Sequence, residues 1–435
     1  MSPLALGLDL GSSGLRLALA EADGEGKARL LIETSSPYPG SFNQPTAWRQ
    51  GLISLAQQLP AELRQKVEAI SIDGTSGTLL LCRPDGSLLD GALGLALPYH
   101  QAFPQQAKAA AELCAATGPS PAASASGSLA RALQLLQQAH QTGAGPELLL
   151  RHQADWLMGW LLADWRWGEE GNNLRLGWDL ERGHWAGSIA SQPWAPALPT
   201  IQASGTVLGP LATASALALG LPGSCLVVAG STDATAAILA ADPQEGDGVT
   251  VLGTTMVLKQ FAASPIRGPG LSCHRIAGRW LVGGASNAGA GVLRRFYTDA
   301  QITELSRQID PERPTGLQLL PLPAPGERFP VDDPTLEPRL EPRPVSDALY
   351  LQALLEGLTL IEARGWRRLG ELGAPPLRQV ITLGGGARNP QWRLMRQRAL
   401  GITVRNRPGL SAALGMARLA LQAQARMGGS VVATR

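Results

Sequence analysis

Residues 6–19, LGLDLGSSGLRLAL, and residues 249–259, VTVLGTTMVLK, carry the pattern that decides the fold. In each stretch an apolar run leads into a glycine and two hydroxyl residues, and a second apolar run follows. This pattern predicts a strand, a tight turn and another strand. Glycine lets the backbone approach a ligand closely, and the free amides and hydroxyls of such a turn suit a phosphate oxygen. Two such hairpins, one in each half of the chain, therefore predict two lobes that grip one polyphosphate.

The composition fits a globular chain of two domains or more. Of the 435 residues 44% are hydrophobic, and 37 basic against 35 acidic residues leave a formal net charge of +2. This small charge gives no sign of a nucleic-acid or membrane-surface partner, and nothing indicates a protein partner. The four cysteines lie far apart without a CxxC pair, which favours reduced thiols, a cytoplasmic location and no zinc site.

Neither a membrane span nor a signal peptide is expected. The stretch Gly183–Thr232 has no Asp, Glu, Lys or Arg, but its prolines divide it into pieces too short to cross a membrane as a helix. The amino terminus lacks a basic region, and Asp9 interrupts its apolar run, which is not typical of a signal peptide.

The order of apolar segments predicts an α/β chain. Helical patterns are expected near residues 48–59, 105–116, 128–141, 153–163, 347–372 and 412–427. A buried strand at Cys225–Ala229 runs into Asp233 and a helix, and the glycines 384–386 likewise follow a strand and open a helix. The proline-rich residues 319–344 predict a surface excursion.

A purely structural role is an alternative for both Asp233 and Asp9. Asp233 would serve as the N-cap of the helix that follows it, and Asp9 would cap the turn at Gly11. The sequence around Gly26-Lys27 lacks the glycine and hydroxyl residue of a P-loop, so the paired hairpins would have to hold any nucleotide phosphates.

Taken together, LGLDLGSSGLR, GSTDATAA, VTVLGTTMVLK, LEGLTLIEARGWRRL and LGGGARNPQW resemble the FGGY carbohydrate kinases in order and spacing. The resemblance runs from about Leu4 to about Leu421. IDGTSGTLLL, GGASNAG and LPAPGERFP are most similar to the cyanobacterial and plant-chloroplast branch, first labelled xylulokinase-like and better described as D-ribulose kinase. The resemblance implies two actin-like (ribonuclease H-like) lobes with a central nucleotide and sugar cleft. The N-terminal, sugar-binding lobe is expected at residues 1–238, joined by a C-terminal helix at 411–435, and the nucleotide-binding lobe at 239–410.

The same resemblance implies roles for individual residues. Asp233 is expected to be the general base, with Asp9 and Ser12 assisting catalysis, and Asp9 and Asp233 would hold Mg²⁺. The substrate-binding residues would be Asp9, Asp73, Thr75, Ser76 and Asp233. The ATP-binding residues would be Gly11, Ser12, Ser13, Gly253, Thr254, Thr255, Gly384, Gly385, Gly386, Asn389 and Trp392. Core packing is the alternative for Trp392, and a solvent-facing turn is the alternative for the residues at 73–76.

The chain departs from the family pattern at three places. The sugar-holding segment that many members carry after the DGTSG turn is replaced by ALPYHQAFP, where His100 is the one polar contact expected. An Asp-containing segment is replaced by Glu169–Asn173, where Glu170 would substitute for it or the contact is lost. Ser411 stands where the family often has Glu.

These departures favour a short sugar held by few contacts. The expected activity is ATP- and Mg²⁺-dependent phosphorylation of a ketopentose, with D-ribulose as the first choice and D-ribulose 5-phosphate as the product. D-Xylulose or another polyol is the alternative within the family. Two other classes stay open, a non-kinase ATP-switch protein of the actin-like superfamily and a pseudo-kinase that binds without transfer.

Overall fold

The computed structural model describes residues 2–115 and 120–432 and divides the chain into two compact units. The first comprises residues 1–240, 275–278 and 411–435, and the second comprises residues 241–274 and 279–410. The first unit was expected to end at residue 238 and to resume at residue 411. In the structure its first segment ends at residue 240, and its last segment begins at residue 411. The segment 275–278 also belongs to the first unit, which the sequence pattern did not indicate. No helix in the described ranges is long and apolar enough to cross a membrane.

A six-stranded sheet in the order β11-β12-β4-β1-β2-β3 forms the framework of the first unit. Strands β4 and β12 run parallel to β1, whereas β2, β3 and β11 are antiparallel to their neighbours. The bounds are β1 Leu4–Leu10, β2 Leu15–Ala22, β3 Ala28–Ser36, β4 Val67–Gly74, β11 Val207–Pro210 and β12 Leu226–Thr232.

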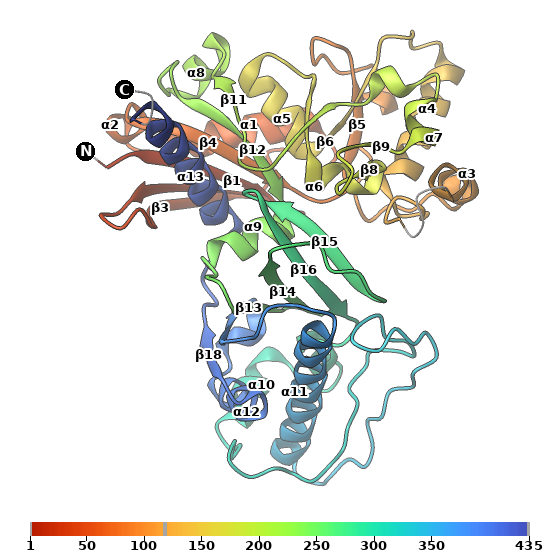
Figure 1. Ribbon diagram of the computed structural model, residues 1–435, viewed down its shortest axis with the longest axis vertical. Coiled ribbons are helices and arrows are strands. Elements are labelled where there is room, and N and C mark those ends of the chain that lie inside the picture. The colour runs from red at the N-terminus through yellow and green to blue at the C-terminus, as the bar shows by residue number, and fades with distance from the viewer. Residues whose placement is uncertain (1, 116–119, 433–435) are drawn as a thin grey trace. The chain divides into compact units, whose positions relative to one another are not determined.

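Helix α13 lies across this sheet, as Figure 1 shows. Gly7 permits the close approach, because a Cβ there would lie 2.0 Å from the Ala413 carbonyl oxygen. Helices α1, α5 and α8 supply buried apolar side chains to the core of this unit, which is centred on buried leucines of β1 and β2. The bounds of the helices in this unit are α1 Pro45–Gln57, α2 Ala61–Arg64, α5 Gln153–Leu162, α8 Thr213–Leu219, α9 Asp233–Ala240 and α13 Ala412–Val432.

The chain between β4 and β12 also builds a smaller cluster of elements with its own apolar core. Three short strand pairs tie it together, β5 with β6, β7 with β10 and β8 with β9. The bounds are β5 Leu79–Cys82, β6 Leu149–His152, β7 Trp167–Glu169, β8 Trp178–Asp179, β9 His184–Trp185, β10 Thr200–Gln202, α3 Pro104–Cys114, α4 Ser128–Thr142, α6 Glu170–Asn173 and α7 Gly187–Ala190, with single 3-10 turns η1 Gly91–Gly94, η3 Leu174–Leu176 and η4 Ala195–Ala197.

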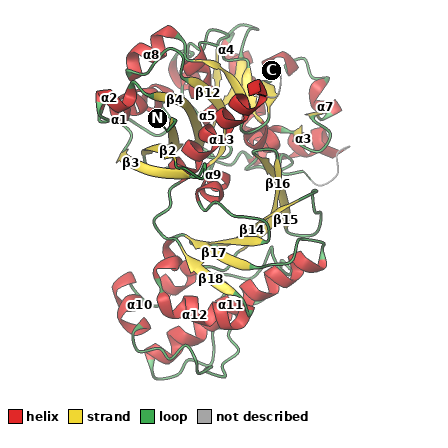
Figure 2. Ribbon diagram, turned by 60° about the vertical axis from the view of Figure 1, so that its left-hand side comes forward, coloured by secondary structure: helices red, strands yellow, loops and turns green. Residues whose placement is uncertain are grey.

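The second unit repeats the six-stranded plan in the order β15-β16-β14-β13-β17-β18. Helices α10, α11 and α12 gather on one side of the strands β14, β17 and β18 (Figure 2). The bounds are β13 Asp247–Leu252, β14 Met256–Ala262, β15 Leu271–Ile276, β16 Arg279–Ser286, β17 Gln379–Leu383, β18 Thr403–Asn406, α10 Asp299–Ser306, α11 Asp347–Glu371, α12 Pro390–Leu400, η5 Ala290–Arg295 and η6 Gly385–Arg388.

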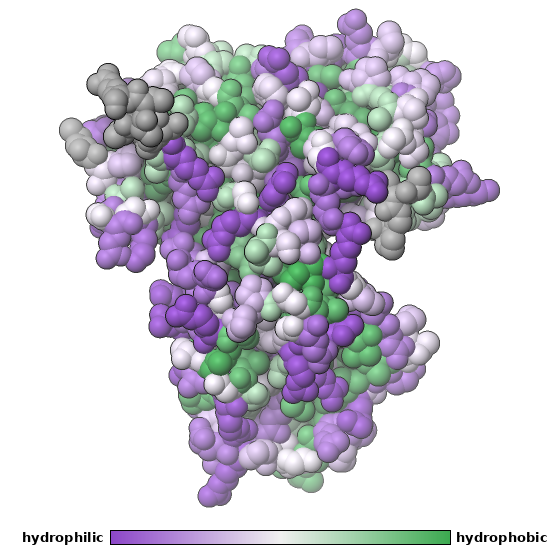
Figure 3. All heavy atoms as spheres, viewed as in Figure 1, coloured by the Kyte–Doolittle hydropathy of each residue, from purple (hydrophilic) through white to green (hydrophobic). Residues whose placement is uncertain are grey.

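The helices expected from periodicity are confirmed to within a few residues. Helix α4 continues to Thr142 and stops at Gly143, whose φ of 67° gives the left-handed C-cap for which glycine is suited. The proline-rich residues 319–344 contain no helix or strand, as expected, but Leu322 and Phe329 in that segment are buried in the core of the second unit. On the face drawn in Figure 3, hydrophilic residues are spread over both units between smaller apolar areas.

Candidate active site

Three aspartates meet at the carboxyl ends of neighbouring parallel strands in the first unit. Asp9 in β1 stands opposite Asp73 in β4, and Asp73 in turn stands opposite Ser231 in β12, two residues before Asp233. Open α/β sheets bind their ligands at this end of the strands. The sequence order alone separates these residues by more than two hundred positions, so it is the parallel pairing that makes them one group.

Asp73 is the buried member of the group. Its side chain is fully enclosed, and within the described residues no N–H or hydroxyl group donates to either of its oxygens, so that its polar partner is the carboxyl group of Asp9. Burial, followed by the negative charges of Asp9 and Asp233, raises its pKa well above the ordinary value for aspartate. Asp73 therefore favours its protonated form, which limits the repulsion between the three carboxyl groups.

Asp233 is half-buried at the first position of α9. Burial is the main reason that its pKa is raised to about 6, and Asp9 adds to the shift, while a hydrogen bond from the Ala234 amide at 2.7 Å opposes it. Asp9 is also half-buried, and burial raises its pKa although Asp73 and Arg16 act in the other direction. A carboxylate with a pKa near 6 is a better proton acceptor than a free aspartate.

The β1–β2 turn places Ser12 and Ser13 at the surface beside this group. The turn is held from outside the hairpin, because the Tyr38 hydroxyl donates a hydrogen bond to the Gly11 carbonyl oxygen at 2.7 Å. Ser12 is therefore exposed three residues after Asp9, on a turn whose backbone is fixed.

The turn after β4 divides the predicted sugar contacts into two kinds. The Thr75 hydroxyl is buried, donates to Gln153 Oε1 at 2.7 Å and lies 2.6 Å from the Thr78 hydroxyl. Ser76 is half-exposed, and no hydrogen bond of its side chain is found among the described residues. Of the two hydroxyls, that of Ser76 is available to a ligand, whereas that of Thr75 shapes the turn.

The glycine turns of the second unit come together at the same edge of its sheet. Val251 stands opposite Leu383 in the parallel pair β13–β17, so the turn of Gly253–Thr255 and the glycines 384–386 are neighbours. Gly384 has a φ of 83°, and a Cβ there would lie 2.6 Å from the Leu252 carbonyl oxygen. Gly385 is exposed, with no atom within 4 Å of the position of a Cβ, so a ligand has access to its backbone.

A third glycine segment, which the sequence interpretation missed, packs on the Thr254 turn. A Cβ on Gly289 would lie 2.5 Å from the Thr254 carbonyl oxygen, and the Ala290 amide donates to the Gly253 carbonyl oxygen at 2.9 Å. In the sequence interpretation GGASNAG was noted for its similarity to one branch of the family, and not as part of this turn. The alternation of glycines beyond the strand end was the available signal.

Two side chains predicted to bind ATP have structural contacts instead. Trp392 is 1% exposed and donates its indole N–H to the Thr359 hydroxyl at 3.0 Å, which corrects the expectation that it flanks adenine. A ring with no free face packs the core and cannot stack on a base. Asn389 caps α12 by accepting from the Trp392 amide and donates to the Ser306 hydroxyl at 2.8 Å.

The departures from the family pattern also have structural explanations. Glu170 is buried and bound by Arg275, with the shortest contact at 2.6 Å, so its carboxylate is already paired. His100 is exposed on the loop after β5. Ser411 caps α13 through a bond from the Leu414 amide at 3.2 Å and donates to Glu33, which is a structural role.

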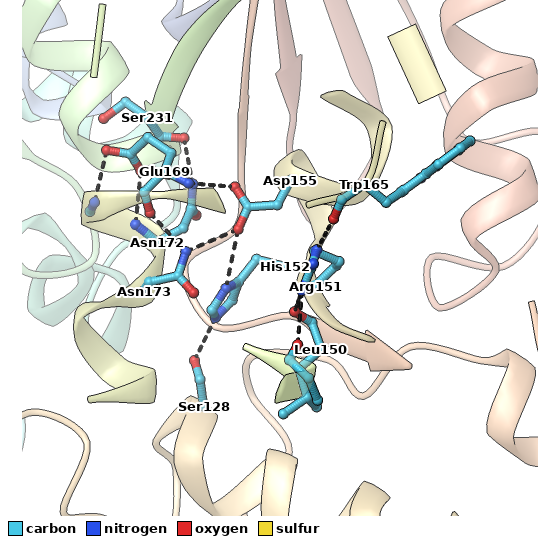
Figure 4. Close-up of polar contacts among 12 residues, drawn as sticks. Ser128, Leu150, Arg151, His152, Asp155, Trp165, Glu169, Asn172, Asn173 and Ser231 are labelled. Atoms are coloured by element: carbon cyan, nitrogen blue, oxygen red, sulfur yellow. Dashed lines mark hydrogen bonds and ion pairs between the residues drawn. The ribbon is translucent and has the colours of Figure 1, made fainter. Parts of the chain in front are cut away.

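Figure 4 shows the buried network around Glu169, which lies in the smaller cluster of elements between β4 and β12 of the first unit. Ser128 lies 3.0 Å from His152 Nε2, and His152 Nδ1 lies 3.5 Å from Asp155, an arrangement that resembles a hydrolytic triad. All three side chains are at most 1% exposed. A nucleophile so enclosed cannot reach a substrate, so this network is structural.

No group of three or more His, Cys, Asp and Glu side chains within residues 2–115 and 120–432 is arranged to hold a metal ion. Mg²⁺ commonly takes only one or two carboxylates and completes its six ligands with water and phosphate oxygens. Asp9 and Asp233 fit that smaller donor set, because each is half-buried and neither has a basic side chain within ion-pair distance in the described chain.

Comparison with known proteins gives one family match and several similar folds. Residues 248–424 match the model of the FGGY family of carbohydrate kinases, C-terminal domain. The fold is similar to that of a xyloylose kinase from Brucella ovis, with a TM-score of 0.81 and 19% identity over 97% of this chain and 91% of that one. For a xylulose kinase from Bifidobacterium adolescentis the TM-score is 0.77 and the sequence identity 19%, over 98% of this chain and 93% of that one. For a glycerol kinase from Plasmodium falciparum with ADP the TM-score is 0.76 and the sequence identity 14%, over 97% of this chain and 90% of that one.

The whole chain thus has the two-lobed actin-like α/β fold of these kinases, as the sequence predicted. The family match itself is confined to residues 248–424, where the chain is similar to the C-terminal domain of the FGGY carbohydrate kinases.

Proposed function

We propose that the protein transfers the γ-phosphoryl group of ATP to the terminal hydroxyl of a ketopentose, D-ribulose being the first choice. The observation that carries this proposal is Asp233, a half-buried carboxylate with a pKa raised to about 6 beside Asp9 and Asp73. Asp233 lies outside the residues 248–424 that match the FGGY carbohydrate kinases, but its burial and raised pKa suit a group that accepts a proton from a sugar hydroxyl.

The chemistry is a direct displacement. Asp233 takes the proton from the sugar hydroxyl as its oxygen attacks the γ-phosphorus, the bond to the β-phosphate oxygen breaks, and ADP leaves. Phosphoryl transfer requires little covalent help from the protein, and most of the barrier is lowered by alignment and charge stabilisation. The proton therefore leaves late, and a base with a pKa near 6 is sufficient.

The proposed ATP site uses backbone groups more than side chains. The amides and hydroxyls of the turns at 11–13 and 253–255 would bind the phosphates, and the exposed backbone of Gly385 would approach the nucleoside. Asn389 contributes by fixing the start of α12. Mg²⁺, held by Asp9 and Asp233, would neutralise charge on the phosphates.

The proposed sugar site is sparse. Ser76 offers a hydroxyl that has no hydrogen-bond partner among the described residues, and the following loop contributes Tyr99 and the exposed His100. Asp9 stands opposite Asp73, three residues before Ser76. Because Glu170 is already paired with Arg275, it is not available as a further ligand. Few contacts suit a short sugar, which supports a pentulose over a longer substrate.

D-Xylulose is the second candidate, since a kinase of that sugar shares this fold. A sugar-independent ATP switch is the alternative of another class. The test is ADP release with Mg-ATP against D-ribulose, D-xylulose, L-ribulose, glycerol and a blank without sugar. ADP release that depends on D-ribulose supports the proposal. ADP release with D-xylulose and not with D-ribulose makes D-xylulose the substrate, and equal release in the blank refutes the kinase function.

A further inference from the structure

A hydrogen-bonded chain joins the turn at Gly11 to the turn at Thr75, both in the first unit. The Tyr38 hydroxyl donates to the Gly11 carbonyl oxygen at 2.7 Å and accepts from Gln153 Nε2 at 3.2 Å. Gln153 Oε1 then accepts from the Thr75 amide at 3.1 Å and from the Thr75 hydroxyl at 2.7 Å. Two side chains thus connect the proposed phosphate turn with the proposed sugar turn.

The donor and the acceptor of each hydrogen bond between Gly11 and Thr75 follow from the chemical groups involved. The Thr75 amide can only donate, so the oxygen of the Gln153 side chain must face it and the nitrogen must face Tyr38. Tyr38 remains a donor because burial raises the pKa of its phenol, and the nearby charge of Asp9 adds to the shift. The Gly11 carbonyl requires such a donor.

Gln153 is held on several sides. Its side chain is fully buried at the first position of α5, and its own amide donates to the Thr78 carbonyl oxygen at 3.1 Å. The Gly74 position lies directly against it, since a Cβ there would be 3.3 Å from Gln153 Oε1. A residue so restrained has one rotamer, and it can therefore transmit a fixed spacing from one turn to the other.

The pairing of the strands sets this spacing only up to the start of the two turns. Backbone pairing aligns β1 with β4 as far as Leu10 and Gly74, and both turns begin where that pairing ends. Within the described chain, the side-chain hydrogen bonds that link the two turns run through Tyr38 and Gln153.

We propose that Tyr38 and Gln153 are positioning residues that set the distance between the phosphate turn and the sugar turn, and so align the accepting hydroxyl with the transferred phosphoryl group. This inference rests on the proposed kinase function. Neither side chain needs to touch the sugar or the nucleotide, because their effect passes through Gly11 and Thr75. A displacement of about 1 Å in such an alignment lowers turnover roughly 100-fold.

The test uses the full chain with Tyr38→Phe, which removes one hydroxyl and keeps the ring that packs edge-on against Phe42. The matched control is Tyr350→Phe in the second unit, whose hydroxyl also donates to a backbone carbonyl, that of Leu340 at 2.9 Å. For each protein we would measure kcat, both KM values, the melting temperature and the ratio of ADP to sugar phosphate formed.

Tyr38→Phe is expected to lower kcat with the best sugar roughly 10- to 100-fold, with the KM for ATP changed less than threefold. Its ratio of ADP to sugar phosphate should rise above one, because misaligned ATP is hydrolysed instead. Hydrogen exchange of the backbone amides at residues 10–15 should speed up. Tyr350→Phe should keep wild-type kcat and ratio, at a similar melting temperature.

Gln153→Met breaks the same chain at its centre. If the two residues act as one unit, the double variant Tyr38→Phe/Gln153→Met should lose no more kcat than the more damaging single variant. An active wild type with an equally active Tyr38→Phe, or an equal loss in Tyr350→Phe, overturns this inference alone. A wild type that transfers phosphate to no sugar in the panel overturns the proposed function itself.

Discussion

Replacing Asp233 with Asn separates the proposed catalytic role from a capping role. The change keeps a side chain that caps helices well and removes a charge that the fold disfavours. In the folded protein the pKa of Asp233 is about 6, against 3.8 for an unperturbed aspartate, a difference of about 2. At about 1.4 kcal/mol per unit this would be ~3 kcal/mol, and partial exposure reduces it to ~1–2 kcal/mol.

The sign follows from proton linkage. Because the folded pKa is raised, the folded state binds more protons between pH 4 and pH 6, and the aspartate costs stability once the pH exceeds about 6. Asp233→Asn should therefore raise the melting temperature by a few degrees at pH 8, with the gain disappearing as the pH falls towards 4. Turnover should fall roughly 10²- to 10⁴-fold, the usual contribution of a general base.

The assay is coupled ADP release with the best sugar, together with thermal unfolding at pH 8 and pH 4.5. Asp347→Asn is the control of opposite sign, because Arg343 lowers the pKa of Asp347 at the surface of the second unit. That variant should keep full activity and gain no stability at pH 8. The reasoning would be refuted if Asp233→Asn kept more than a tenth of wild-type turnover. It would also be refuted if the variant melted at a lower temperature than the wild type at pH 8.

Three further outcomes follow from the site. Trp392→Ala should destabilise the second unit by about 3–5 kcal/mol, and a selective rise in the KM for ATP at unchanged stability would return Trp392 to the nucleotide site. Gly384→Ala should weaken ATP binding more than sugar binding, since its φ of 83° and the 2.6 Å approach to Leu252 leave no room for a Cβ; a nucleotide titration checks it. Ser76→Ala should raise the KM for the sugar about fivefold, the equivalent of one hydrogen bond of ~1 kcal/mol, with unchanged melting, and an unchanged KM would remove Ser76 from the sugar site.

The pH dependence offers an independent check on the base. If Asp233 accepts the proton, kcat/KM for the sugar should fall below an apparent pKa near 6, because the protonated carboxyl cannot act as a base. The profile should be measured with Mg-ATP saturating, and a flat profile between pH 5 and pH 8 would contradict the assignment.

Local chemistry explains which features could be predicted from the sequence. The strand–turn–strand pattern around Gly11 and Gly253 requires only residues close in the chain, and both hairpins are present. The helices α4 and α11 have apolar periodicity and clear ends, and their bounds agree with the expectation to within one residue. The division into two lobes followed from the same repeat.

Contacts made across the fold have no comparable signal in the sequence. Nothing local distinguishes Gln153, the first residue of a helix, from any other polar helix start, and Tyr38 lies in an irregular segment between β3 and α1. Trp392 and Glu170 were placed by family position, but burial and a partner 105 residues away determine what they do.

The sequence by itself determined that this chain forms two glycine–hydroxyl hairpins in an α/β fold, because turn chemistry and apolar alternation are properties of neighbouring residues. The family resemblance assigned Asp9, Asp73 and Asp233 to one site, but only the tertiary structure decided that parallel strands bring them together, and that Thr75 shapes its turn while Ser76 stays available. The physical reason is that burial and charge proximity shift a pKa or occupy a hydroxyl only when parallel pairing brings distant strand ends together.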